Sequence, residues 1–292
     1  MKKIIVTGIT GSIGQYIVKP LNELGFNIYG IGTRNIKSPN FNYINLNIND
    51  YQKLQNIFND IKPEYLIHLA WDLSSGYFHS NTNFDMITSS INILKYFKDN
   101  NGKKAIYIGT YAEYSFDNIP AKENDRLNPT TVYAKCKNYL REIFELYCKN
   151  NNIDFCWARL FNTYGENDNN TRLFPYIINS LKNNIKVSVN HSQLEKDYIY
   201  AGDAAKILAL IINSDITGTI NICSGQGIKL SDLAIMIAEK LGKIDLLELN
   251  NFDTDEPLKT IGDNSRIINE LKFTNYTDIN KIIDMIIMDN KL

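Results

Sequence analysis

The chain has 292 residues, of which 44% are hydrophobic and 22% are charged. This balance is typical of a globular protein that buries a sizeable core, as one large domain or two small ones. The 31 Lys and Arg residues nearly cancel the 32 Asp and Glu residues, so the overall charge favours neither nucleic acid nor a membrane surface as a partner. The first apolar run is too short for a signal-peptide core and no later segment approaches a membrane span, so we expect a cytoplasmic protein.

The predicted elements alternate between strand and helix from the start of the chain. Residues 4–6 form a short apolar run followed by glycines, which is typical of a buried parallel strand. A helix over 13–24 and a strand over 27–31 complete a first βαβ unit. The alternation continues, with strands predicted over 43–46, 65–70, 105–109 and 154–160, and helices over 51–59, 84–98 and 132–149. This regularity predicts an α/β fold, a Rossmann doubly wound parallel sheet with helices on both faces.

The last third of the chain has a looser pattern. Helices are predicted over 172–181, within 199–212 and over 231–241, and a strand over 219–222. We therefore expect a dinucleotide-binding Rossmann domain of residues 1–160 plus 197–222. A smaller C-terminal substrate-binding domain should comprise residues 161–196 plus 223–292.

The four cysteines form neither a close pair nor a zinc-like spacing. We expect them to be buried free thiols and expect no metal site. These cysteines are Cys136, Cys148, Cys156 and Cys223.

A glycine-rich run follows the first strand and opens the first helix. Glycine allows the tight turn, lets a pyrophosphate approach bare backbone, and lets the helix pack closely on the strand. The helix N-terminus then offers amide donors to the phosphates. The residues predicted to bind the cofactor here are Gly8, Thr10, Gly11, Ser12, Ile13 and Gly14.

The Gly-x-x-Gly-x-x-Gly spacing of this run resembles the short-chain dehydrogenase/reductase superfamily. It is most similar to the extended branch, the NAD(P)-dependent sugar-nucleotide epimerase, dehydratase and reductase family. Segments at 67–70, 159–165, 196–203 and 218–225 resemble further stretches of that family, so the likeness covers essentially the whole chain. It implies a homodimer that pairs the helices over 84–98 and 132–149 into a four-helix bundle.

The end of the second strand separates NADP from NAD as the cofactor. An acidic residue there binds the ribose hydroxyls of NAD, whereas this chain has Gly32 followed by Thr33 and Arg34, which can donate to the extra phosphate of NADP. We therefore predict NADP(H), with NAD(H) as the alternative if Arg34 is only a solvated loop charge. The resemblance adds four cofactor-binding residues, Asn47, Ile48, Leu69 and Ala70.

Tyr133 and Lys137 lie four residues apart in a predicted helix, so they share one face. They resemble the family's Tyr-x-x-x-Lys motif, which identifies them as the predicted catalytic pair. A free tyrosine has a pKa of about 10, too high for efficient proton exchange at neutral pH, and a nearby ammonium lowers it. The resemblance also implies that Lys137 binds the nicotinamide ribose.

The family's third catalytic member, a Ser or Thr, is less well defined in this chain. Tyr111 falls at the expected position and Thr110 lies one residue earlier, and we prefer Thr110. Glu113 matches one half of the Asp-Glu pair of sugar-nucleotide 4,6-dehydratases, but Ala112 replaces the Asp. Because dehydration needs a positioned acid and base, this loss argues against a dehydratase. Glu113 is either a substrate contact or a plain structural acid.

Three further residues are predicted to contact the substrate. The resemblance implies that Asn162 contacts the sugar nucleotide. Lys196 stands where an Arg usually grips the diphosphate, and it offers a point charge without the bidentate fork. Arg172 could replace that Arg or could be only a helix-terminal charge. His68 is expected to be a structural polar group.

These features predict NADPH-dependent reduction of a keto group at carbon 4 of a nucleotide-linked 6-deoxyhexose or heptose, in carbohydrate biosynthesis such as that of surface polysaccharide. Hydride goes to the carbonyl carbon while Tyr133 protonates the developing alkoxide. The alternative enzyme is a nucleotide-sugar 4-epimerase with tightly bound NAD. A more distant alternative is a catalytically dead regulator that senses a dinucleotide.

Overall fold

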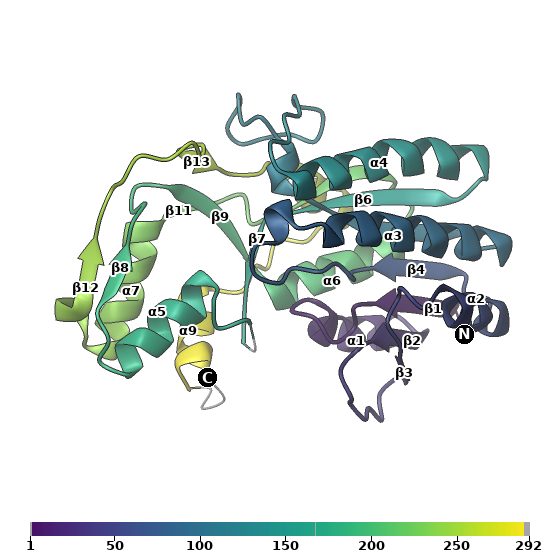
Figure 1. The fold of residues 1–292 in the computed structure, drawn as a ribbon, viewed down its shortest axis with the longest axis horizontal. Helices are drawn as coiled ribbons and strands as arrows, with labels where there is room; N and C mark the ends of the chain where they lie inside the picture. The colour runs from purple at the N-terminus through teal and green to yellow at the C-terminus, as the bar shows by residue number, and fades with distance from the viewer. Residues whose placement is uncertain (1, 167, 289–292) are drawn as a thin grey trace.

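The computed structural model describes residues 2–166 and 168–288 and contains a large parallel sheet with a smaller assembly at its edge (Figure 1). The strand order of the large sheet is β10-β6-β5-β4-β1-β2-β3, and each neighbouring pair is parallel. The sheet is built from β1 (Lys2–Thr7), β2 (Phe26–Gly32), β3 (Asn42–Asn45), β4 (Tyr65–His68), β5 (Lys104–Thr110), β6 (Asp154–Leu160) and β10 (Gly218–Ile222). The predicted α/β Rossmann class is confirmed.

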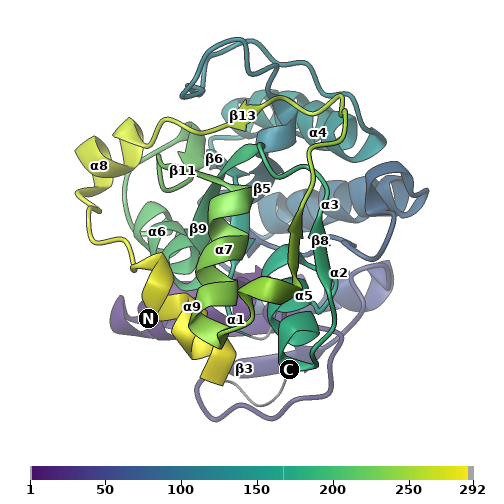
Figure 2. The same cartoon turned by 90° about the vertical axis from the view of Figure 1, so that its left-hand side faces the viewer.

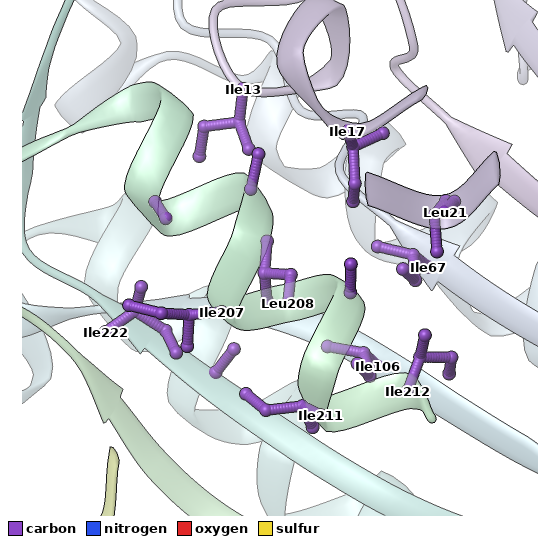
Figure 3. Packing of buried hydrophobic residues seen from close by; sticks show 14 of the residues in the cluster. Ile13, Ile17, Leu21, Ile67, Ile106, Ile207, Leu208, Ile211, Ile212 and Ile222 are labelled. Carbon is purple, nitrogen blue, oxygen red and sulfur yellow. The ribbon is translucent and has the colours of Figure 1, made fainter. Parts of the chain in front are cut away.

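Helices cover both faces of this sheet, as the alternating pattern predicts. On one face, α1 (Gly14–Glu23) and α6 (Ala201–Ile212) share an apolar core with the strands. Figure 3 shows Ile207, Leu208 and Ile211 of α6 among Ile106 and Ile222 of the strands. The opposite face carries α2 (Tyr51–Ile61), α3 (Thr82–Asp99) and α4 (Val132–Asn150), which form the second core with the same strands.

The C-terminal assembly has its own apolar core around α5 (Leu173–Lys182), α7 (Leu230–Leu241) and α9 (Ile279–Met288), which lie together in Figure 2. Its strands are short and form one sheet, β11-β9-β13 with β7 beside β9, and a second pair, β12-β8. They span β7 (Asn162–Tyr164), β8 (Val187–Val189), β9 (Glu195–Tyr200), β11 (Gly227–Lys229), β12 (Leu247–Leu249) and β13 (Lys259–Thr260). The remaining elements are α8 (Ser265–Leu271) and three 3₁₀ turns, η1 (Tyr77–His79), η2 (Tyr111–Glu113) and η3 (Ile244–Leu246).

The segment that returns from the small assembly to the large sheet begins differently from the prediction. Residues 199–200 end strand β9 of the small sheet, and the helix predicted within 199–212 begins at Ala201. The proposed return segment 197–222 therefore runs from the small sheet through α6 to β10 of the large one. We retain the division into a Rossmann domain and a substrate-binding domain as a proposal.

The four cysteines are free and buried, which confirms the expectation for the thiols. Burial raises the pKa of Cys148 and of Cys156 to about 12, so these thiols stay protonated at neutral pH. Within the described residues, no helix is both long and apolar enough to cross a membrane.

Candidate active site

A cavity of about 760 Å³ opens at the carboxyl ends of β1, β4, β5 and β6, where a doubly wound sheet binds its ligands. Its walls include the glycine-rich loop and residues 168–172, before α5. Its lining includes these predicted site residues: Gly8, Gly11, Ser12, Ile13, Gly14, Arg34, Leu69, Ala70, Thr110, Tyr111, Tyr133, Lys137, Asn162 and Arg172. The fold thus brings most of the predicted catalytic and binding residues to one cavity.

The glycine-rich loop has the geometry that a dinucleotide phosphate needs. Gly8 has φ of +70°, and a Cβ on it would lie 2.7 Å from the Ala70 amide nitrogen, so only glycine fits this turn. A Cβ on Gly14 would overlap the Gly8 carbonyl oxygen. The first turn of α1 has neither an acidic residue nor a side-chain cap, which leaves the positive end of the helix for an anion. These residues therefore fit a pyrophosphate.

The end of β2 has no acidic side chain at position 32, and this position is crowded by neighbouring side chains. A Cβ on Gly32 would lie 2.8 Å from Thr10 Oγ1 and 3.2 Å from the Tyr43 hydroxyl. Two residues later Arg34 is exposed and lines the cavity, and its carbonyl accepts a hydrogen bond from Tyr43. The cavity here is thus bordered by a cation without a neighbouring carboxylate at position 32.

Four predicted cofactor residues are not among those that line the cavity. Thr10 lies against Gly32, and Thr33 and Asn47 are exposed at the strand ends, whereas Ile48 is buried in the core beside α2. Their contact with a cofactor stays a prediction.

Helix α4 carries Tyr133 and Lys137 into the cavity. The Thr131 hydroxyl accepts a hydrogen bond from the Ala134 amide at 3.1 Å, which fixes the first turn and so the Tyr133 ring. Tyr133 is 8% exposed and Lys137 is 4% exposed. The Lys137 ammonium donates to the Ile108 carbonyl at 2.8 Å and lies 5.9 Å from the centre of the Tyr133 ring.

The expected lowering of the Tyr133 pKa by Lys137 is wrong for the protein alone. Burial raises the pKa of Tyr133 well above its ordinary value, nearby Tyr77 raises it further, and the neighbouring Thr110 hydroxyl lowers it only in part. Burial also lowers the pKa of Lys137 to about 7, against the opposing effect of Glu113. Burial therefore outweighs the attraction between the two groups, so Tyr133 is a neutral phenol at neutral pH, whereas Lys137 titrates near neutrality and its ammonium form remains available.

Thr110 and Tyr111 both line the cavity but have different surroundings. Thr110 is buried at the end of β5, and its hydroxyl is near enough to Tyr133 to lower the pKa of that phenol. Tyr111 instead stacks on Phe161, with ring centres 5.6 Å apart, and burial raises its pKa to about 12. This arrangement supports the preference for Thr110 as the hydroxyl that acts together with Tyr133.

Glu113 does not reach the cavity, so the predicted substrate contact is wrong. Its side chain is fully buried, and its carboxylate accepts hydrogen bonds from Arg159 Nε at 2.7 Å, the Thr110 amide at 2.8 Å and Trp157 Nε1 at 3.1 Å. These bonds fix the end of β5, so Glu113 is a structural acid, which was the alternative to a substrate contact. The partner, Arg159, was visible in sequence only as part of the family-like segment 159–165.

The predicted substrate residues divide between the cavity and its surroundings. Asn162 lines the cavity, and its amide donates to the Asp197 carbonyl at 3.1 Å. Arg172 also lines it, with Nη1 3.2 Å from the Thr163 hydroxyl and 3.3 Å from the Asp168 carboxylate. Lys196 is paired with Glu256 at 2.6 Å and is not among the lining residues, so its predicted grip on a diphosphate has no support in this arrangement.

His68 is a structural polar group, as predicted. Its ring is buried between the Thr7 hydroxyl, 2.7 Å from Nδ1, and the Ser90 hydroxyl, 3.0 Å from Nε2. Burial lowers its pKa to about 3, so it is neutral.

Sequence reasoning missed an aromatic wall that follows β4. Trp71, Tyr77 and Phe78 line the cavity, and all three make edge-on contacts with the Tyr133 ring, with Tyr77 closest at 5.0 Å between ring centres. The sequence signal that could have revealed this wall is the group of aromatic residues in the loop directly after strand β4, whose carboxyl end borders the cavity.

Comparison with known proteins places this geometry in a family. Residues 4–223 match the model of the NAD dependent epimerase/dehydratase family. A Methanocaldococcus jannaschii protein named "Putative UDP-glucose 4-epimerase" is 26% identical over 258 residues, covering 82% of each chain. CDP-abequose synthase from Yersinia pseudotuberculosis is 26% identical over 223 residues, covering 73% of this chain and 74% of that protein.

The fold matches solved structures over almost the full length. The crystal structure of a UDP-glucose 4-epimerase from Thermotoga maritima, solved with UDP-glucose, has a TM-score of 0.88 and covers 98% of this chain and 97% of its own. The sequence identity is 19%, so this likeness establishes the fold alone.

Proposed function

The chain belongs to the NAD dependent epimerase/dehydratase family of sugar-nucleotide enzymes, and from this premise we propose that it uses NADPH to reduce a keto group of a nucleotide-linked deoxy sugar or heptose, at carbon 4. The observation that carries the proposal is the end of β2. Gly32 stands where the carboxylate that binds the ribose of NAD is expected, so that carboxylate is missing, and a Cβ there would crowd the side chains of Thr10 and Tyr43. Arg34 at the cavity edge supplies a cation for the additional phosphate of NADP.

A preference for NADPH is typical of net reduction with a cofactor that dissociates after each turnover. NADPH, when bound, supplies a hydride to the carbonyl carbon. The chain itself supplies the proton, because the neutral Tyr133 hydroxyl is the acid that protonates the developing alkoxide. The Thr110 hydroxyl, next to Tyr133, donates to the carbonyl oxygen. The Lys137 ammonium nitrogen lies 5.9 Å from the centre of the Tyr133 ring, where the ammonium offsets the negative charge that Tyr133 acquires.

The polar lining of the cavity supports a nucleotide-linked sugar. Asn162 and Arg172 line the cavity, and Asn169 and Thr171 add further polar side chains to its walls. Arg172 is a candidate for the diphosphate, since a guanidinium can form two parallel hydrogen bonds to it.

The described side chains argue against a dehydratase. The acid that matches half of the dehydratase pair, Glu113, is buried against Arg159 and Trp157, and its partner position holds Ala112. No acid–base pair is thus available at neighbouring sugar carbons from these two positions.

The second candidate is a nucleotide-sugar 4-epimerase with tightly bound NAD. It is favoured by the Methanocaldococcus jannaschii relative, whose name is that of an epimerase. Tyr133 and Lys137 would serve both reactions, so the cofactor decides between them.

We also propose that the enzyme is a homodimer through α3 and α4. Large apolar side chains on these helices are strongly exposed, namely Phe84 (56%), Tyr139 (57%), Ile143 (54%) and Leu146 (62%). Exposed apolar side chains gathered on two neighbouring helices are characteristic of an interface between subunits.

The test is a cofactor and turnover assay on the purified protein. Absorbance of NADPH is followed with a panel of nucleotide-linked 4-keto sugars, and the bound dinucleotide is identified by mass spectrometry. The proposal expects NADPH oxidation that disappears in Tyr133→Phe and no copurified NAD. Copurified NAD without net oxidation of NADPH would support the epimerase instead.

A further inference from the structure

The catalytic lysine lies against a tryptophan that the mechanism above does not use. The ring centre of Trp71 is 3.6 Å from the Lys137 ammonium nitrogen, well within the range of a cation–π interaction. Trp71 follows the carboxyl end of β4 and lines the cavity, whereas Lys137 reaches it from α4. Two elements far apart in sequence thus meet at the reacting end of the cavity.

A buried asparagine fixes the plane of this indole. The Trp71 Nε1–H donates to Asn83 Oδ1 at 3.0 Å, and Asn83 is fully buried. The amide of Asn83 donates in turn to the carbonyls of Tyr77 at 2.7 Å and Ser80 at 2.8 Å. Each polar atom of Asn83 is therefore bonded, and a side chain with all its partners holds the indole in one orientation.

The face of the Trp71 indole is the main contact that positions the Lys137 ammonium. Among residues 2–166 and 168–288, the recorded hydrogen-bond acceptor of the ammonium is the neutral Ile108 carbonyl, and no carboxylate forms an ion pair with it. One acceptor satisfies one of the three N–H groups of an ammonium. The face of a Trp ring is the best aromatic partner for a cation, and the attraction is larger where water is excluded.

We propose that Trp71 is a positioning residue that acts through Lys137. Its indole face holds the ammonium against the Ile108 carbonyl and close to the Tyr133 ring. The inference rests on the proposed function in one respect, because it takes Lys137 to work beside Tyr133. Asn83 fixes the orientation of the indole, the indole fixes the position of the Lys137 ammonium, and the ammonium offsets the negative charge of Tyr133.

The titratable groups around Lys137 come from three elements. Glu113 of η2 and Cys136 of α4 favour its charged form, while burial opposes it, and His68 of β4 lies close enough for the ammonium to lower its pKa. Since His68 is neutral and Cys136 is protonated at neutral pH, the indole and Glu113 are the groups that stabilise the ammonium.

The experiment measures the reactivity of the Lys137 amine without requiring turnover. The full-length protein is labelled with trace acetic anhydride at a series of pH values, and labelling of Lys137 is read by peptide mass spectrometry. Trp71→Leu keeps an apolar side chain at this position but removes the aromatic ring. The ammonium form of Lys137 then loses the ring that stabilises it, so the pH midpoint of labelling should fall by roughly one unit. Trp71→Phe should give a smaller fall in the same direction.

The matched control is Phe78→Leu, which removes another aromatic ring that contacts Tyr133 and should leave the Lys137 midpoint unchanged. Thermal melting identifies folded variants, and Trp71→Phe decides the question if Trp71→Leu does not fold. A midpoint that stays in place or rises in both Trp71 variants would overturn the proposal.

Kinetics supply the second measurement. Trp71→Leu should lower kcat with little change in KM, and the double variant with Lys137→Met should be no slower than Lys137→Met alone. If the double variant were slower than Lys137→Met by the same factor that Trp71→Leu alone produces, the two residues would act independently, which would contradict a role of Trp71 through Lys137. If the wild-type protein reduced no keto sugar, the proposed function would fail, and the labelling result would still decide whether Trp71 holds the ammonium.

Discussion

Replacing Glu113 by Ala should destabilise the protein far more than a usual loss of a charge. The carboxylate is fully buried, and its partner Arg159 has a side chain only 2% exposed, with 2.7 Å between Nε and Oε2. Without Glu113, the guanidinium remains in the interior without its counter-charge, and Trp157 Nε1 and the Thr110 amide lose their acceptor. Removing one member of a buried ion pair costs about 3–5 kcal/mol, so we expect a loss of that size in the free energy of unfolding.

The assay is urea unfolding at neutral pH, supported by thermal melting, where such a loss lowers Tm by roughly 10 °C. The control is Glu142→Ala, since Glu142 is 54% exposed and lies 3.4 Å from Arg141, and an exposed pair contributes less than about 1 kcal/mol. Glu113→Leu combined with Arg159→Met should recover part of the loss, because no charge is then left buried. A Glu113→Ala loss no larger than that of the control would refute the reasoning.

Four further outcomes are expected. Arg34→Ala should weaken NADPH binding about tenfold or more and leave NADH binding almost unchanged, as measured by calorimetric titration, because one charge-assisted hydrogen bond to the phosphate is lost. Gly32→Asp should weaken binding of NADPH by a larger factor, and an unchanged affinity would show that β2 does not face the phosphate. Lys137→Met should stabilise the protein at neutral pH, because folding lowers the pKa of Lys137 to about 7. Between about pH 7 and 10 the unfolded wild-type chain binds more protons than the folded protein, so the free energy of unfolding of the wild type rises with pH over this window. The difference in stability between wild type and variant should therefore shrink as the pH rises, as measured by urea unfolding. Ile143→Asp should convert a dimer to a monomer in sedimentation velocity, and a wild-type protein that sediments as a monomer would contradict the proposed interface.

The features that could be predicted from sequence are those encoded by residues close together in the chain. The glycine-rich loop joins β1 to α1 within a few residues, and the Tyr133–Lys137 pair is set by one helical turn. The regular alternation through residue 160 predicted six of the seven strands of the large sheet, because short, largely apolar runs such as residues 4–6 alternate with helical patterns.

The features that sequence could not supply depend on contacts between distant segments. Glu113 looks like an exposed acid until β6 brings Arg159 beside it, 46 residues later. Trp71 looks like a loop aromatic until α4 brings Lys137 against its face. The short strands of the C-terminal assembly, such as β8 and β13, have too few residues to show a periodic pattern.

The most direct test of the central claim is the transfer of an isotope from the cofactor to the sugar. NADPH that carries deuterium at the reactive carbon of its nicotinamide is incubated with the enzyme and a nucleotide-linked 4-keto sugar, and the product is analysed by mass spectrometry and NMR. We expect one deuterium bound to carbon 4 of the reduced sugar and one NADPH consumed for each product formed. A product formed without deuterium, or an isomerised sugar formed without consumption of NADPH, would contradict it.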